Sequence, residues 1–298
     1  MCEHRAVRTR VAFVIGGGGR LGAVEVGMLR ALTEAGIAAD LVFGTSIGAV
    51  NGAAYAADPT PAGIDRLESV WTRVEESGVF GGGIVERVRH MARTRTSLHS
   101  ADALRDLLED SLPARFEDLE VPFGCVAACI ETAHERWFTE GPLVPAVLAS
   151  CAVPGLLPAV RLGDEHFIDG GVIDSIPVRR AIDAGATTIY VLQVGRIEQP
   201  LSPPRWPHEV AVVAFEIARR HSFASTLASL PDDVVVHVLP TGGRGPRPTD
   251  LRQLRYGDFG GTGDSIAQAR AACAAYLEMH SHGGGPPGRD TGPGEENR

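Results

Sequence analysis

A short apolar run that stops at four consecutive glycines is the feature that most constrains how this chain can fold. Residues 11–15 read VAFVI, rich in β-branched side chains, and residues 16–19 are all glycine. A run this short that ends in a glycine loop is typical of a buried parallel strand. From Gly22 the apolar residues take helical spacing, and the helix is expected to end at Gly36. The segment therefore predicts a strand, a glycine loop and a helix.

The same order recurs immediately. Residues 41–43 predict a second strand, residues 44–48 read GTSIG, and a helix rich in small residues is expected over 49–57, stopping near Pro59. Strand, helix, strand, helix is the βαβ pattern of a parallel sheet with helices on its faces. Further strands are expected at residues 121–130, 166–168, 188–194 and 234–239.

Length and composition favour one large domain. The chain has 298 residues, 44% of them hydrophobic and 22% charged, which suits a soluble α/β protein with a full core. We expect a polar extension over residues 1–10, one domain over 11–282 and a disordered Gly/Pro-rich tail over 283–298. Helices are expected over 61–112, where a basic cluster at 87–95 is either a solvated helix face or a surface that touches lipid headgroups.

The charged residues exclude several kinds of function. All 28 basic residues are arginine, so a Walker-type phosphate loop, Schiff-base chemistry and a Ser-Lys pair all lack their lysine. The formal net charge of −9 argues against nucleic acid as a partner. The first apolar run is too short for a signal peptide or a membrane span, which favours a cytoplasmic location.

The five cysteines are odd in number and scattered, so reduced thiols are expected. Cys125 and Cys129 form a C-x-x-x-C pair that could be half of a metal site. Because no second pair or histidine cluster completes a tetrahedron, we predict no metal.

The glycine loop indicates an anion-binding site. Gly17 to Gly22 formally match the dinucleotide pattern G-x-G-x-x-G, but Asp40, the acid at a suitable distance, precedes the second strand instead of following it. Outward-facing amides at a helix N-terminus can bind a phosphate or a developing oxyanion. A nucleotide- or dinucleotide-binding domain that uses this loop without hydrolysis therefore stays open as the alternative function.

Ser46 is the candidate nucleophile. It lies in G-x-S-x-G between a predicted strand and a predicted helix, where a sharp turn needs the small neighbours Gly44 and Gly48. Such a turn lifts the hydroxyl to the end of the sheet and aims the helix N-terminus at it.

Asp169 is the candidate base. An α/β-hydrolase would place its serine after several strands and supply a late histidine, whereas Ser46 comes after only two predicted strands and no histidine lies in a convincing strand-end loop. In His166-Phe167-Ile168-Asp169-Gly170-Gly171 a predicted strand delivers an acid into a glycine turn, although Asp-Gly-Gly is also a common plain turn.

Taken together, these features resemble the patatin-like phospholipases. The resemblance covers the glycine loop and its helix, the nucleophile turn, the stretch at residues 149–155, and Asp169-Gly170-Gly171 continuing to residue 178, in the family's order. It implies a three-layer α/β/α fold with a mostly parallel central sheet, and a Ser-Asp dyad with no metal or organic cofactor. Ser46 matches the nucleophile and Asp169 the base, and the oxyanion hole matches the amides of Gly17, Gly18 and Gly19.

The chain departs from the family pattern at two positions. The glycine loop has Arg20 and then Leu21 before Gly22, whereas the family carries its arginine at the position of Leu21, which puts a preference for phospholipid in doubt. Ser175 stands where the family commonly has asparagine. The function expected from the resemblance is a serine-dependent lipid acyl hydrolase of phospholipase A or esterase type. Its partners would be lipid or acyl-ester substrates, with peripheral membrane contact.

Overall fold

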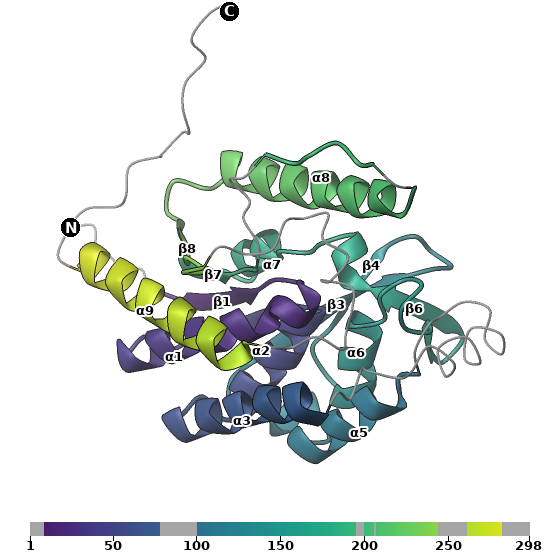
Figure 1. Ribbon diagram of the computed structural model, residues 1–298, viewed down its shortest axis with the longest axis horizontal. Helices are drawn as coiled ribbons and strands as arrows, with labels where there is room; N and C mark the ends of the chain where they lie inside the picture. Colours follow the sequence, from purple (N-terminus) through teal and green to yellow (C-terminus); the bar gives the residue numbers. More distant parts are fainter. Residues whose placement is uncertain (1–8, 78–99, 195–199, 206, 244–260, 282–298) are drawn as a thin grey trace, which may run out of the picture.

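One sheet of eight strands organises the residues that the computed structural model describes, which are 9–77, 100–194, 200–205, 207–243 and 261–281 (Figure 1). The strand order is β5-β6-β3-β2-β1-β7-β8, and β4 pairs with β3 outside this path. The strands are β1 (Val11–Ile15), β2 (Leu41–Thr45), β3 (Phe123–Cys129), β4 (Glu135–Phe138), β5 (Val160–Leu162), β6 (Glu165–Asp169), β7 (Thr188–Leu192) and β8 (Val235–Val238).

Helices follow most of the parallel strands, as the βαβ pattern predicted. The α-helices are α1 (Ala23–Glu34), α2 (Ile47–Ala57), α3 (Pro61–Ser77), α5 (Asp102–Ser111), α6 (Leu143–Ser150), α7 (Val178–Asp183), α8 (Pro207–Ala228) and α9 (Thr262–Ser281). Three short 3₁₀ turns are η1 (Gly19–Gly22), η2 (Phe116–Asp118) and η3 (Gly170–Val172). Among the helices searched in these ranges, none has the length and apolar character needed to cross a membrane.

The alternating side chains of β1 separate two helical layers. Phe13 and Ile15 belong to the larger core cluster, and Ala12 and Val14 belong to the smaller one. The helices α1, α2, α3, α5, α6 and α9 cover the larger core, and α7 and α8 lie on the other face of the sheet (Figure 1). All four side chains are fully buried. Burying one large apolar side chain contributes about 1.5–3 kcal/mol, so both faces stabilise the sheet. The expected three-layer α/β/α fold is confirmed.

The sheet is parallel at its centre and antiparallel at one end. β3, β2, β1, β7 and β8 are parallel to their neighbours in that order, whereas β4 and β6 run antiparallel to β3, and β5 runs antiparallel to β6. The strand predicted at residues 166–168 is therefore present but reversed relative to the central strands. β4 and β5 were not predicted, because four and three residues are too few to show a period of two.

Several predictions fall outside the described residues: most of the N-terminal extension, the basic cluster at residues 87–95 and the tail at 283–298. The predicted helix boundary at Gly36 agrees with the structure, where α1 ends at Glu34 and Gly36 has a φ of +71°. Among the described cysteines, Cys125, Cys129, Cys151 and Cys273 are buried free thiols.

Candidate active site

Ser46 lies on the sharp turn between β2 and α2. Its φ of 56° and ψ of −126° are unfavourable for a side chain with a Cβ, and a residue held in such a region costs about 1–3 kcal/mol. The turn also requires glycine on both sides. A Cβ on Gly44 would lie 2.4 Å from the Gly48 carbonyl oxygen, and one on Gly48 would lie 2.2 Å from the Ile15 carbonyl oxygen. This is the geometry that G-x-S-x-G predicted.

Two strands that run toward each other along one side of β3 bring the serine and the acid together. Thr45 at the end of β2 is opposite Val126, and Asp169 at the end of β6 is opposite Ala127. Ala127 also pairs with Arg136 of β4, so β4 occupies the other side of β3 and β6 lies in line with β2. The last residues of β2 and β6 therefore pair with adjacent residues of β3. As a result Ser46, which follows Thr45, lies next to Asp169.

The Ser46 hydroxyl donates a hydrogen bond to Asp169 Oδ2 over 2.5 Å. The second oxygen, Oδ1, accepts a hydrogen bond of 2.7 Å from the Gly171 amide. Gly170 must also lack a side chain, since its Cβ would lie 2.2 Å from the Val126 carbonyl oxygen. The Asp-Gly-Gly turn therefore orients the carboxylate as well as ending the strand.

Burial makes the Asp169 carboxylate a stronger base than an exposed one. Asp169 is 5% exposed and Ser46 is 7% exposed. Loss of solvation raises the pKa of Asp169 from 3.8 to about 6, against the opposing effect of the hydrogen bonds from Ser46 and Gly171. A carboxylate with this pKa is ionised near neutral pH and still accepts a proton readily.

The backbone of Ser46 is held by the C-terminal end of α6, a contact that sequence reasoning missed. The Ser46 amide donates to Ser150 Oγ over 3.0 Å, and the Cys151 thiol donates to the Ser46 carbonyl oxygen over 3.1 Å. Burial raises the pKa of the Cys151 thiol, so it remains neutral and can donate. The only sequence signal was that both residues lie in the stretch at 149–155 that carried the family resemblance.

The glycine loop lies against Ser46. A Cβ on Gly17 would lie 3.3 Å from the Ser46 Cβ, and a Cβ on Gly18 would lie 1.6 Å from Val194 Cγ2. The Gly17 amide already donates to the Ser175 carbonyl oxygen over 3.0 Å. In the part of the chain that the structure describes, the amides of Gly18 and Gly19 have no acceptor.

A buried polar network fixes the end of the glycine loop to the helix that follows Ser46. The Asn51 amide nitrogen donates to the Gly22 carbonyl oxygen over 2.9 Å and to Glu25 Oε2 over 2.7 Å, and Trp71 Nε1 donates to Asn51 Oδ1 over 3.0 Å. Desolvation raises the pKa of the Glu25 carboxyl well above its usual range, against the opposing effect of the hydrogen bond from Asn51. Gly22 itself allows close packing, because its Cβ would lie 2.6 Å from Ile47 Cγ1. The sequence pattern did not indicate this network.

Asp40 lies at the wrong end of the sheet for a dinucleotide site. Its Oδ2 accepts a hydrogen bond of 2.8 Å from the amide of Val11, the first residue of β1, whereas the glycine loop follows the last residue of β1. Asp40 therefore cannot hold a ribose bound at the loop. Among the described residues, no group of three or more His, Cys, Asp or Glu side chains is placed to hold a metal ion.

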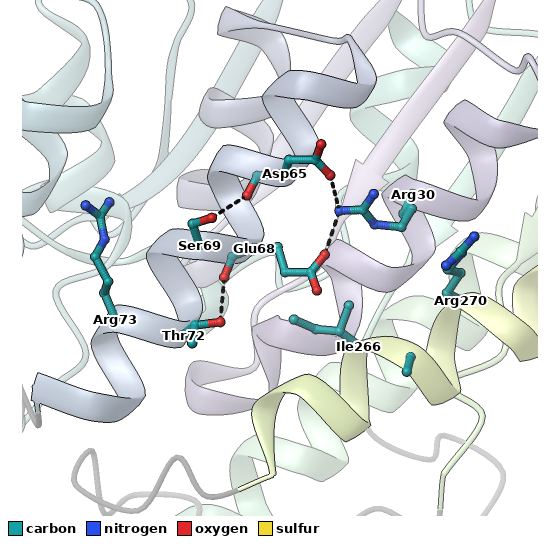
Figure 2. A pocket seen from close by; sticks show the side chains of 9 residues that line it. Arg30, Asp65, Glu68, Ser69, Thr72, Arg73, Ile266 and Arg270 are labelled. Atoms are coloured by element: carbon teal, nitrogen blue, oxygen red, sulfur yellow. Dashed lines mark hydrogen bonds and ion pairs between the residues drawn. The ribbon is translucent and has the colours of Figure 1, made fainter.

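A separate cavity of about 680 Å³ lies between α1, α3 and α9 (Figure 2). Arg30 crosses it and forms ion pairs of 2.7 Å with Asp65 and 2.6 Å with Glu68. Ser46 and Asp169 are not among its lining residues. With its charges already paired, this cavity adds no group to the candidate site.

A serine on a strained strand-to-helix turn is typical of hydrolases with a nucleophile elbow, and here a buried acid at the end of an antiparallel strand accepts its hydrogen bond. The family model described as patatin-like phospholipase matches residues 13–182, more than half of the chain. The chain belongs to the patatin-like phospholipase family.

Named relatives are similar to the same part of the chain. The patatin-like phospholipase domain-containing protein ZK370.4 of Caenorhabditis elegans is 32% identical over 191 residues, which are 63% of this chain and 14% of the relative. The human patatin-like phospholipase domain-containing protein 6 is 33% identical over 62% of this chain and 13% of its own length. Lysophospholipase nte1 of Aspergillus terreus is 31% identical over 65% of this chain and 13% of its own length. The match therefore spans about one seventh of each relative.

Solved structures that the chain matches include VipD from Legionella pneumophila, with a TM-score of 0.40 and 13% identity over 89% of this chain and 67% of that chain. The complex of ExoU with SpcU from Pseudomonas aeruginosa gives a TM-score of 0.41 and 14% identity, over 92% of this chain and 53% of that chain.

Proposed function

We propose that this chain is a serine-dependent lipid acyl hydrolase that cleaves carboxylic esters through a Ser46-Asp169 dyad. The observation that carries the proposal is the 2.5 Å hydrogen bond between a serine on a strained turn and a carboxylate that is 5% exposed. Membership of the patatin-like phospholipase family supports a lipid ester as the substrate. The proposal includes the phospholipase A or esterase type of cleavage and a cytoplasmic protein in peripheral contact with membranes.

In the proposed first step, Ser46 Oγ attacks the ester carbonyl carbon while Asp169 Oδ2 takes the hydroxyl proton. The tetrahedral intermediate then collapses, the bond to the alcohol oxygen breaks, and Asp169 returns the proton to that alcohol as it leaves. Water next attacks the acyl-serine with Asp169 again as the base, which releases the fatty acid and restores Ser46. No step requires a histidine, a metal ion or an organic cofactor.

The glycine loop would stabilise the negative charge that develops on the carbonyl oxygen. We assign this role to the amides of Gly18 and Gly19, which have no acceptor among the described residues, while the Gly17 amide holds the loop to Ser175. The sequence also predicted the Gly17 amide as an oxyanion donor. In that role it would first have to break its hydrogen bond to the Ser175 carbonyl oxygen. Removing one oxyanion donor typically costs about 3 kcal/mol in the barrier.

The names of the relatives indicate which substrates to test. Two of the named relatives are patatin-like phospholipase domain-containing proteins and one is a lysophospholipase. Because the chain matches only about one seventh of the length of these relatives, we take their substrates as candidates to test. Phospholipid, lysophospholipid and monoacylglycerol should therefore be compared directly.

The deciding experiment combines active-site labelling with turnover. Wild-type protein should react with a fluorophosphonate probe and hydrolyse p-nitrophenyl butyrate. Ser46→Ala should lose both, because the nucleophile is gone. Asp169→Asn should keep its fold but hydrolyse about 10²- to 10⁴-fold more slowly, the usual range for loss of a general base.

The matched control is Ser202→Ala, which removes an exposed serine outside the site. It should label and hydrolyse as the wild type does. If the folded wild type neither labels nor hydrolyses any of the esters, or if Ser46→Ala labels normally, the dyad proposal is wrong.

A further inference from the structure

The outward face of α8 carries no formally charged side chain. From residue 209 to residue 228, the exposed side chains that the structure describes are Val210, Phe215, Ile217 and His221, and otherwise only alanine and serine. Val210 is 54% exposed and Ile217 is 56% exposed, and the two lie seven residues apart on one side of the helix. In a chain that is 22% charged, this is an unusual surface for a long helix.

Three charged side chains in the middle of the same helix are mostly buried instead. Glu216, Arg219 and Arg220 have side chains that are only 17%, 5% and 15% exposed, and Glu216 forms ion pairs of 3.1 Å and 3.2 Å with the two arginines. A surface helix ordinarily turns its charges to water and its apolar residues to the core. Here the two partly buried arginines share one glutamate, and the apolar residues are left outside.

One edge of this exposed face, at Phe215, borders the candidate active site. A Cβ on Gly171, whose amide orients Asp169, would lie 3.3 Å from Phe215 Cζ of α8. Val172 and Ile173, the next two residues, are 47% and 38% exposed and extend the apolar surface from the helix toward the dyad. In Figure 1, α8 is the outermost helix on its side of the sheet, opposite α3 and α5.

We propose that α8, together with Val172 and Ile173, is the surface by which this chain lies on a lipid monolayer or bilayer. The inference rests on the proposed function, because a hydrolase of membrane lipids must hold its dyad close to the lipid surface. A 22-residue helix is about 33 Å long and can lie in the interface with its apolar side chains among the acyl chains.

Lipid fits this face better than a protein partner does. Protein interfaces depend mainly on tyrosine, tryptophan and arginine anchors, and the described exposed face of α8 has one phenylalanine and otherwise small or aliphatic side chains and one histidine. The net charge of −9 and the uncharged face together favour zwitterionic over anionic lipid. Binding should therefore need no anionic lipid and should not weaken in high salt.

The test is co-sedimentation of the full chain with phosphatidylcholine vesicles, alongside hydrolysis of the same vesicles and of p-nitrophenyl butyrate in their absence. Val210→Glu and Ile217→Glu should each weaken vesicle binding about tenfold or more and reduce vesicle hydrolysis in parallel. Hydrolysis of p-nitrophenyl butyrate should stay within about twofold of the wild type, because neither residue contacts the dyad. Met279→Glu is the control, since Met279 is 68% exposed on α9 across the sheet.

Ser46→Ala separates this inference from the proposed function. It should bind vesicles like the wild type while hydrolysing nothing, so a failure of catalysis leaves the binding result intact. The inference is overturned if the wild type does not bind the vesicles, or if the two α8 variants bind them as well as Met279→Glu does. It is also overturned if the wild type is a dimer and the α8 variants are monomers, because α8 would then pack against a second copy of the chain.

Discussion

Replacing Asp169 by asparagine should abolish most activity and make the protein more stable, by an amount that depends on pH. In the folded chain, burial raises the pKa of Asp169 from 3.8 to about 6. A folded-state pKa above the unfolded value means that the unfolded chain loses this proton at lower pH. The wild type therefore becomes less stable as pH rises from about 4 to about 6, and its stability is then level with respect to this group.

The magnitude follows from the same two values. At 1.36 kcal/mol per pKa unit, the difference between 3.8 and about 6 corresponds to about 3 kcal/mol. Asp169→Asn has no ionisable group there, and its amide can still donate to Ser46 and accept from Gly171. Its stability relative to the wild type should therefore increase by about 2.5 kcal/mol between about pH 4 and about pH 8, because pH 4 already lies just above the unfolded pKa of 3.8.

Urea denaturation of both proteins at the two pH values measures this change. Comparing the variant with the wild type at each pH cancels the other titrating groups, because Glu25 and the remaining acids are present in both. Asp110→Asn, at an exposed position on α5, controls for loss of a surface carboxylate. If the stability difference between Asp169→Asn and the wild type is the same at both pH values, the argument that burial raises this pKa is refuted.

Three further predictions concern the same site. The kcat/KM for p-nitrophenyl butyrate should rise about tenfold per pH unit up to about pH 6 and then level off, because Asp169 must be ionised; a profile that is flat below about pH 6 would contradict its role as base. Gly18→Ala should reduce kcat/KM about tenfold or more, since its Cβ would lie 1.6 Å from Val194 Cγ2, whereas Gly263→Ala, with open space around it, should not. Ser175→Ala should leave the free energy of unfolding unchanged or raise it by about 1 kcal/mol in urea denaturation, because the buried hydroxyl has no partner among the described residues; a clear loss of stability would reveal one.

Local sequence patterns predicted the first part of the fold because the structure there is determined by residues that are close in sequence. The run at residues 11–15, the glycines after it and the small residues around Ser46 determine a strand, a loop and a turn without reference to the rest of the chain. β4 and β5 gave no such signal, since Glu135–Phe138 and Val160–Leu162 are too short and too polar to show a buried face.

The contacts that complete the candidate site join residues far apart in sequence. The spacing of residues within a local motif does not predict such contacts. Asn51 joins Gly22 to Trp71 across three helices, and Ser150 reaches the Ser46 amide from α6. Local patterns proposed Ser46 as nucleophile and Asp169 as base, and the family resemblance implied that the two form a dyad. Its physical basis, a reversed strand that ends opposite Ala127, depends on the register of β6 on β3.

That register also explains how a carboxylate can work here without histidine. Here β6 runs against β2, so the two strand ends meet on adjacent positions of β3 and a short aspartate side chain spans the gap. The same meeting point is buried, which raises the pKa of Asp169 to about 6. One feature of the topology thus supplies both the position and the basicity of the proposed base.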